Sequence, residues 1–346
     1  LNRLEFKEMC KKYLVFLSLF IFVISSCGGG GGGSPAQAPQ QNTTTPTPVP
    51  TPAPSPTPTP APNSITSNLI AQTKGMINGE MSYKEINREF ILYVPSSYDS
   101  SAKQPLIFNF HGYGSNANEQ MNYGDLRSQA DANGFILVHP EALDDIGGTS
   151  YWNMGGWSIS AHDDLEFIDN LINLLMDKYS VNAERIYSTG MSNGGFFSFH
   201  LACNLNSSFA AIASVTGSMS YETFENCNAR KPTPVLQIHG SIDTVVPYNG
   251  IESIMKPVSE VIEYWKLNNG CDDFILSIPE VLPGATSWTE TYLFENCLNG
   301  TQNIHLYING AGHIWPGSIY ASIREPDSSK RIWEFFSKYD INGVIQ

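Results

Sequence analysis

Short apolar runs alternate with longer amphipathic segments along most of the chain between residues 88 and 340, and this alternation restricts the fold more than any other feature. Several runs are apolar without interruption, as strands covered on both faces of a sheet require. The pattern predicts an α/β fold in which a mostly parallel central sheet carries helices on both faces. The expected strands span 88–95, 105–112, 134–140, 185–190, 209–217, 234–240 and 303–310.

The segments between these runs carry apolar side chains at helical spacing. Within residues 163–180 the apolar positions recur at steps of three and four residues and form one stripe that a sheet can bury. Residues 259–270 and 328–340 follow the same pattern. In sheets of this type the chemistry lies beyond the carboxyl ends of the strands, so we expect functional residues in the loops that follow them.

The N-terminus has the order of a secretory signal. Lys11 and Lys12 precede an apolar run at 13–24 that is too short to span a bilayer, and small residues lead to Cys27. The ending "ISSC" is similar to the lipobox of bacterial lipoproteins, which implies a leader over residues 1–26 and a lipid on Cys27. An ordinary cleaved signal or a short membrane anchor is the alternative.

A low-complexity segment follows the leader. Glycines after Cys27 give way to a Pro/Thr/Ala tract at 35–62 without a single charge, which favours extended polyproline II and leaves little apolar surface to bury. At roughly 3 Å per residue such a tract reaches about 90 Å. We therefore expect a tether over residues 27–64 and one folded catalytic domain over 65–346.

The charge excludes one class of partner. The chain has a net charge of −14 and no basic cluster, whereas nucleic-acid binding needs Lys and Arg to displace counterions. We expect no nucleic-acid partner, no metal and no cofactor.

Cysteines beyond the leader stand at 203, 227, 271 and 297. In an exported domain an even number suggests disulfides, although four cysteines allow three pairings. Sequential pairs close short loops, so we expect Cys203–Cys227 and Cys271–Cys297. A metal site built from all four thiolates would lack the usual C-x-x-C spacing.

The stretch "YSTGMSNGGFF" places Ser192 between glycines at 190 and 194, directly after the expected strand at 185–190. G-x-S-x-G is too short to be decisive alone. A strand before it and a helical pattern after it predict a nucleophile elbow, in which a strained turn exposes the serine hydroxyl. The backbone N–H of Asn193, at the start of that helix, would then face a developing oxyanion.

A serine hydroxyl needs a base, and the base needs an orienting acid. Asp243 follows the strand at 234–240, and His313 lies in a Gly-rich loop after the strand at 303–310. In this interpretation His313 is the base and Asp243 holds its tautomer. The second oxyanion donor is expected in "FNFHGYGSN", as the backbone N–H of Tyr113.

Together, "HGYGSN", "GMSNGG", "HGSIDTVVPYNG", "GGWSISAHDDLEFI" and "GAGHIWPG" resemble α/β-hydrolase esterases of the polyhydroxybutyrate depolymerase and feruloyl esterase type. The resemblance covers nearly all of residues 75–340. It implies the α/β-hydrolase fold, the triad Ser192, Asp243 and His313, and a disulfide pattern like the one expected above.

Four aromatic residues are expected to line the substrate pocket. Tyr113 lies in the first motif, Trp152 and Trp157 in a Gly-rich loop, and Trp315 two residues after His313. For Trp152, packing beneath the loop is an equal alternative.

These features predict a serine carboxylic-ester hydrolase that acts through an acyl-enzyme. We expect it outside the cytoplasm, as an outer-membrane or cell-surface lipoprotein held through Cys27, or secreted. The first expected substrate is a polyhydroxyalkanoate polyester or its oligomers, and the alternative is a feruloyl or acetyl ester on polysaccharide such as xylan. A peptidase, or a surface-binding module without activity, is a further alternative.

Overall fold

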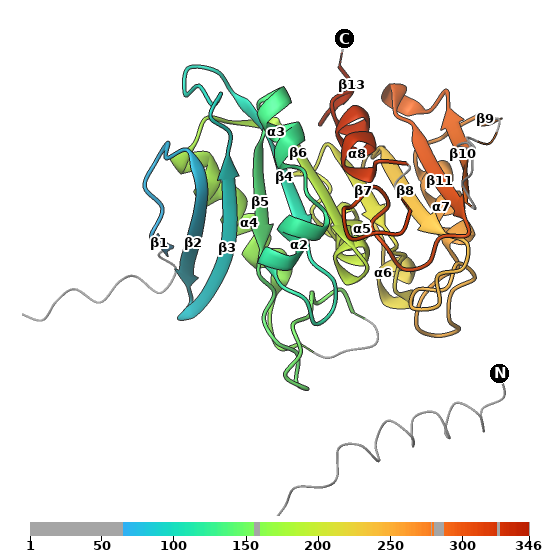
Figure 1. Cartoon of the computed structure of the whole chain (residues 1–346), viewed down its shortest axis with the longest axis horizontal. Coiled ribbons are helices and arrows are strands. Elements are labelled where there is room, and N and C mark those ends of the chain that lie inside the picture. Colours follow the sequence, from blue (N-terminus) through green and yellow to red (C-terminus); the bar gives the residue numbers. More distant parts are fainter. Residues whose placement is uncertain (1–64, 156–159, 278, 280–286, 324–325, 346) are drawn as a thin grey trace, which may run out of the picture. The chain divides into compact units, whose positions relative to one another are not determined.

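The computed structural model describes residues 65–155, 160–277, 279, 287–323 and 326–345 (Figure 1). The expected leader and tether, including Cys27, lie outside these residues. In the described part of the chain the main sheet has eleven strands in the order β1-β2-β3-β5-β4-β6-β7-β8-β11-β10-β9.

The centre of the sheet is parallel, as the sequence predicts. Each neighbouring pair from β5 through β4, β6, β7 and β8 to β11 is parallel. The carboxyl ends of these strands therefore lie at one edge. Their bounds are β4 Gln104–Phe110, β5 Ile136–Pro140, β6 Val181–Met191, β7 Ala211–Val215, β8 Val235–Gly240 and β11 Asn303–Asn309.

Antiparallel strands flank this centre on both sides, drawn blue at one end of Figure 1 and orange at the other. They are β1 Thr66–Ser67, β2 Gly75–Tyr83, β3 Ile86–Val94, β9 Asp273–Leu276 and β10 Trp288–Glu295. A separate hairpin pairs β12 Tyr339–Asp340 with β13 Gly343–Val344. Of the flanking strands only β3 was expected.

Alternate residues of the central strands face opposite layers, because successive side chains of a strand point to opposite faces. Phe108 of β4 packs in the core beneath helices α4 (Asp164–Lys178) and α5 (Asn193–Asn204). Its neighbour Ile107 packs beneath α3 (Arg127–Asn133) and α8 (Ser328–Phe336) on the other face. Helix α7 adds Trp265 to a third cluster, against Phe199 of α5. Helices therefore cover both faces. No helix among the described residues is both long and apolar enough to cross a membrane.

The bounds of the described helices are α2 Ala117–Tyr123, α3 Arg127–Asn133, α4 Asp164–Lys178, α5 Asn193–Asn204, α6 Tyr221–Glu225, α7 Val258–Asn268 and α8 Ser328–Phe336, with a 3₁₀ turn at Leu298–Gly300.

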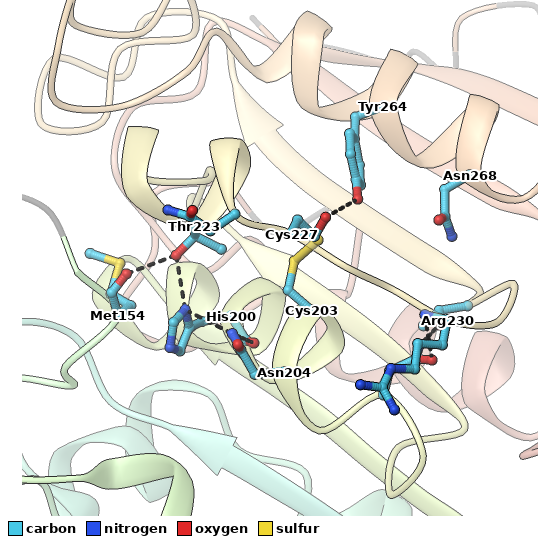
Figure 2. The surroundings of a disulfide bond; sticks show 12 residues. Met154, His200, Cys203, Asn204, Thr223, Cys227, Arg230, Tyr264 and Asn268 are labelled. Carbon is cyan, nitrogen blue, oxygen red and sulfur yellow. Dashed lines mark hydrogen bonds between the residues drawn. A yellow bond between two sulfur atoms is a disulfide. The ribbon is translucent and has the colours of Figure 1, made fainter.

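Two disulfides join the sequential cysteines, Cys203 to Cys227 and Cys271 to Cys297. The first ties the end of α5 to the chain just after α6 (Figure 2). Beside it, Thr223 donates a hydrogen bond to the backbone oxygen of Met154, 2.7 Å away. A sequence separation of 24 residues corresponds to a stabilisation of about 3 kcal/mol in the chain-entropy model.

Candidate active site

Three residues expected to act together follow three parallel strands. Ser192 comes directly after β6, Asp243 lies in the loop after β8, and His313 lies in the loop after β11. Because the carboxyl ends of parallel strands share one edge of the sheet, these loops meet there. Ser192 and His313 line the same pocket, which has a volume of about 640 Å³.

Ser192 occupies a strained turn. Its backbone has φ 54° and ψ −121°, an unusual conformation for a residue with a Cβ. The turn requires glycine on both sides: a Cβ on Gly190 would lie 2.6 Å from the carbonyl carbon of Gly194, and a Cβ on Gly194 would overlap the carbonyl oxygen of Phe110. The Ser192 N–H donates to Val215 O at 2.9 Å, which holds the turn over β7. This is the geometry of a nucleophile elbow.

Asp243 and His313 form a direct pair. His313 Nδ1 lies 2.8 Å from Asp243 Oδ2, and because a carboxylate only accepts, Nδ1 carries the proton. The other carboxylate oxygen, Oδ1, accepts from the N–H groups of Val245 at 2.9 Å and Val246 at 2.8 Å. Burial alone would raise the pKa of Asp243, but the hydrogen bonds from His313 and from the Val246 N–H outweigh it and lower that pKa. The carboxylate is therefore ionised at neutral pH. In the neutral imidazole that donates through Nδ1, the lone pair is on Nε2.

Hydrogen bonds between the loops bring Asp243 to His313. The Ile242 N–H donates to Ala311 O at 3.0 Å, and the Gly310 N–H donates to Ser241 Oγ at 2.9 Å. The two loops pack closely enough that a Cβ on Gly240 would overlap the backbone of Ala311.

His239 lies behind the pair, with Nε2 3.7 Å from Asp243 Oδ2. Its Nε2 lies 2.8 Å from Val246 O and donates to that carbonyl. Burial lowers the pKa of His239. His239 is therefore neutral, and its hydrogen bond to Val246 O stabilises the loop that carries Asp243.

The two expected oxyanion donors belong to segments that lie against each other. A Cβ on Gly112 would lie 3.9 Å from Ser192 Oγ, so the loop after β4 reaches the nucleophile. Asn193 is the first residue of α5, and its N–H has no acceptor within the helix. That Tyr113 and Asn193 donate to an oxyanion stays a prediction.

Of the four aromatic residues expected to line the pocket, the structure places one there and buries two elsewhere. Tyr113 is 47% exposed and lines the pocket. Trp152 is 0% exposed and packs between Phe110 and Phe197 in the core, so the prediction that it lines the pocket is wrong.

Trp315 also departs from its prediction. It is 1% exposed, and its indole N–H donates to Ser329 Oγ at 3.2 Å, away from the pocket. The indoles of Trp152 and Trp315 are large apolar rings, and each N–H has a hydrogen-bond acceptor within the protein. An indole whose N–H has such a partner can be buried. Trp157 lies outside the described residues.

Sequence reasoning missed other pocket residues. Tyr123 at the end of α2, Val245 beside Asp243, and Tyr320 line the pocket together with Tyr113. The rings of Tyr123 and Tyr320 stack, with centroids 6.2 Å apart and an angle of 16°. No motif marks Tyr123 or Tyr320, because these two residues reach the pocket from a short helix and from a loop outside the catalytic motifs.

The sheet, the strained serine turn and the aspartate–histidine pair beyond the strand ends define an α/β-hydrolase. The chain belongs to the phospholipase/carboxylesterase family, whose model matches residues 96–269, half of the chain. The description of this family names ester hydrolases.

Three known proteins illustrate the relationship. A bifunctional acetylxylan esterase/xylanase from Neocallimastix patriciarum is 27% identical over 258 residues, which cover 75% of this chain and 34% of the relative. Feruloyl esterase B from Piromyces equi is 28% identical over 236 residues, 65% of this chain and 42% of the relative. The chain thus spans less than half of either protein. A probable feruloyl esterase C from Aspergillus terreus is 28% identical over 290 residues, 79% of this chain and 94% of the relative.

One solved structure supports the fold. The acetyl xylan esterase from Aspergillus awamori superposes with a TM-score of 0.51 at 17% identity and covers 80% of this chain and 99% of its own.

Proposed function

We propose that this enzyme is a feruloyl esterase that removes aromatic acyl groups from a polysaccharide through an acyl-enzyme. The observation that carries the proposal is the aromatic lining of the pocket beside Ser192 and His313. Tyr113, Tyr123 and Tyr320 all line it, and tyrosine presents both a ring face and a hydroxyl to an aromatic, hydroxyl-bearing acyl group. A volume of about 640 Å³ is within the range for ligands far larger than acetyl.

In the proposed mechanism, Ser192 Oγ gives its proton to Nε2 of His313 and attacks the ester carbonyl carbon. The carbonyl π electrons move onto oxygen, where the N–H groups of Tyr113 and Asn193 stabilise the charge. Asp243 stabilises the imidazolium. The intermediate collapses, His313 returns the proton to the leaving alcohol, and the acyl group remains on Ser192. Water deprotonated by His313 then releases the acid by the same steps.

The curated relatives support this substrate class. Their names specify feruloyl or acetylxylan esters. These names favour a feruloyl or acetyl ester on polysaccharide, the alternative substrate expected from the sequence, over a polyhydroxyalkanoate polyester. An acetylxylan esterase is the second candidate, favoured by the relative from Neocallimastix patriciarum.

We also propose that a lipid on Cys27 and the tether over residues 27–64 hold the catalytic domain, residues 65–346, at an outer-membrane or cell surface. The two disulfides are consistent with a location outside the cytoplasm, where such bonds form and persist.

A side-by-side assay of methyl ferulate, acetylated xylan, p-nitrophenyl acetate and amorphous polyhydroxybutyrate tests the substrate class. We expect kcat/KM to be highest for methyl ferulate. Tyr320→Ala should lower kcat/KM for methyl ferulate about 2- to 12-fold, because an aromatic contact contributes roughly 0.5–1.5 kcal/mol. The same variant should leave p-nitrophenyl acetate hydrolysis unchanged. Activity confined to acetyl esters, or an equal loss on both substrates in Tyr320→Ala, would contradict the aromatic subsite.

A further inference from the structure

Trp152, although excluded from the pocket, hydrogen-bonds to both chain segments that carry the proposed oxyanion donors. We infer that Trp152 is a positioning residue that holds the loop at 111–113 and the elbow at 192–193 in a fixed mutual orientation. The inference rests on the proposed serine mechanism and adds a residue to it.

On the elbow side, the contact is made by the Asn193 side chain. Its Oδ1 accepts from the Trp152 N–H at 2.8 Å, and its Nδ2 donates to Trp152 O at 3.2 Å. Asn193 and Trp152 are both 0% exposed. Two opposed hydrogen bonds to one residue's backbone fix the Asn193 side chain, and water cannot replace them at a buried position. The first residue of α5, whose N–H is the proposed donor, is thereby fastened to Trp152.

On the loop side, the Trp152 indole N–H donates to His111 O at 3.1 Å. The next carbonyl, Gly112 O, lies 2.8 Å from His111 Nδ1 and accepts from the Ser115 N–H at 3.1 Å. Because His111 Nε2 accepts from the Ala142 N–H at 3.0 Å, the ring proton is on Nδ1 and points to Gly112 O. Burial lowers the pKa of His111 to about 4, which keeps the ring neutral.

These contacts set the direction of the donor itself. A trans peptide bond places its N–H opposite its C=O. With Gly112 O held toward His111 and Ser115, the Tyr113 N–H points away from both. The indole hydrogen bond to His111 O fixes the preceding peptide plane, so two consecutive planes of the loop are constrained.

Trp152 can hold the two segments in place because its own position is fixed by its neighbours. Its ring stacks on Phe197 with centroids 5.0 Å apart and meets Phe110 edge-on at 5.0 Å. The next N–H along the chain, that of Asn153, donates to Asp164 Oδ2 at 2.8 Å. Asp164 in turn pairs with the buried Arg88, with 2.7 Å between Nη2 and Oδ1.

The expected consequence is a loss of rate without a loss of substrate binding. Oxyanion donors act only when they lie about 2.7–3.1 Å from the charged oxygen, and removing one donor costs about 10²–10³ in kcat. A donor that is misdirected rather than removed should cost less. We expect about 10- to 100-fold in kcat, with KM changed less than about 3-fold.

The test uses the full-length enzyme and p-nitrophenyl acetate, so that acyl preference plays no part. Trp152→Phe keeps a ring but removes the indole N–H, and Asn193→Ala removes the amide while keeping the backbone N–H. Trp265→Phe is the matched control, because Trp265 is also 0% exposed and its Nε1 has no hydrogen-bond partner among the described residues. The measured quantities are kcat, KM, Tm and the Ki of a trifluoromethyl ketone, whose hemiketal with serine carries an oxyanion.

We expect Trp152→Phe and Asn193→Ala each to lower kcat and to weaken the Ki by a similar factor, while Trp265→Phe leaves both unchanged. The double variant should be no more than about 3-fold worse than the poorer single variant, because both changes break one bridge. Wild-type kcat and Ki in either single variant, or fully additive losses in the double variant, would overturn the inference. Asn193→Ala keeps the test decisive if Trp152→Phe does not fold. Substantial activity in Ser192→Ala would refute the proposed mechanism instead, so the two failures are distinguishable.

Discussion

Ser192→Ala should lower kcat for ester hydrolysis by about 10⁴-fold or more, the largest effect of any single substitution proposed for this enzyme. The strained turn exposes one hydroxyl at the pocket that also contains His313. Alanine adopts the same backbone without strain beyond that of serine, so the fold should persist while the acyl-enzyme cannot form. Steady-state kinetics on p-nitrophenyl acetate, with circular dichroism to monitor folding, measure both consequences.

Ser214→Ala is a suitable control. Ser214 is fully buried on the neighbouring β7, and its hydroxyl has no hydrogen-bond partner in the described part of the chain. Its replacement should leave kcat within about 2-fold of the wild-type value, since a buried polar group without a partner stabilises little. A folded Ser192→Ala enzyme with substantial remaining activity would show that another residue is the nucleophile.

Asp243→Asn should lower kcat by about 10⁴-fold through the tautomer of His313. The N–H groups of Val245 and Val246 both donate to Oδ1. These two N–H groups need an acceptor, so in the variant the amide oxygen takes the position of Oδ1. The NH₂ group then faces His313 Nδ1. The imidazole then carries its proton on Nε2, where the Ser192 proton must be accepted.

The control for this change is Asp99→Asn. Asp99 is also a turn carboxylate, and its Oδ1 accepts from the Ser101 N–H at 2.9 Å. It lies between β3 and β4, at the sheet edge opposite the pocket. We expect wild-type kcat in Asp99→Asn and unchanged Tm in Asp243→Asn within a few degrees. A loss in Asp243→Asn of less than about 10-fold would contradict the role assigned to Asp243.

The centre of the fold could be predicted from sequence because its strands are buried on both faces. The expected strands at 105–112, 134–140 and 234–240 coincide closely with β4, β5 and β8. The flanking strands gave no comparable signal. β2 contains two glycines and a glutamate, and it is a strand because it pairs with β3 along its whole length. Helices α2 and α3 have seven residues each, too few to display a helical period.

Some residues of the candidate site could likewise be predicted from sequence, and others could not. Ser192, Asp243 and His313 could be located because each follows a strand of a parallel sheet, so chain order alone places them at one edge. Trp152 and Trp315 could not be placed from sequence, since an indole beside a catalytic loop has equal reason to face the pocket or the core. Tyr320 reaches the pocket from a loop, where it stacks on Tyr123, and no local pattern announces that contact.

The central claim is that His313 activates Ser192 for attack on an ester carbonyl. The most direct measurement is covalent labelling of the native enzyme with a fluorophosphonate, followed by peptide mass spectrometry. We predict one label on Ser192, together with complete loss of activity, and no label when His313 is replaced by alanine. Labelling at another residue, or an active enzyme that remains unlabelled, would contradict the account.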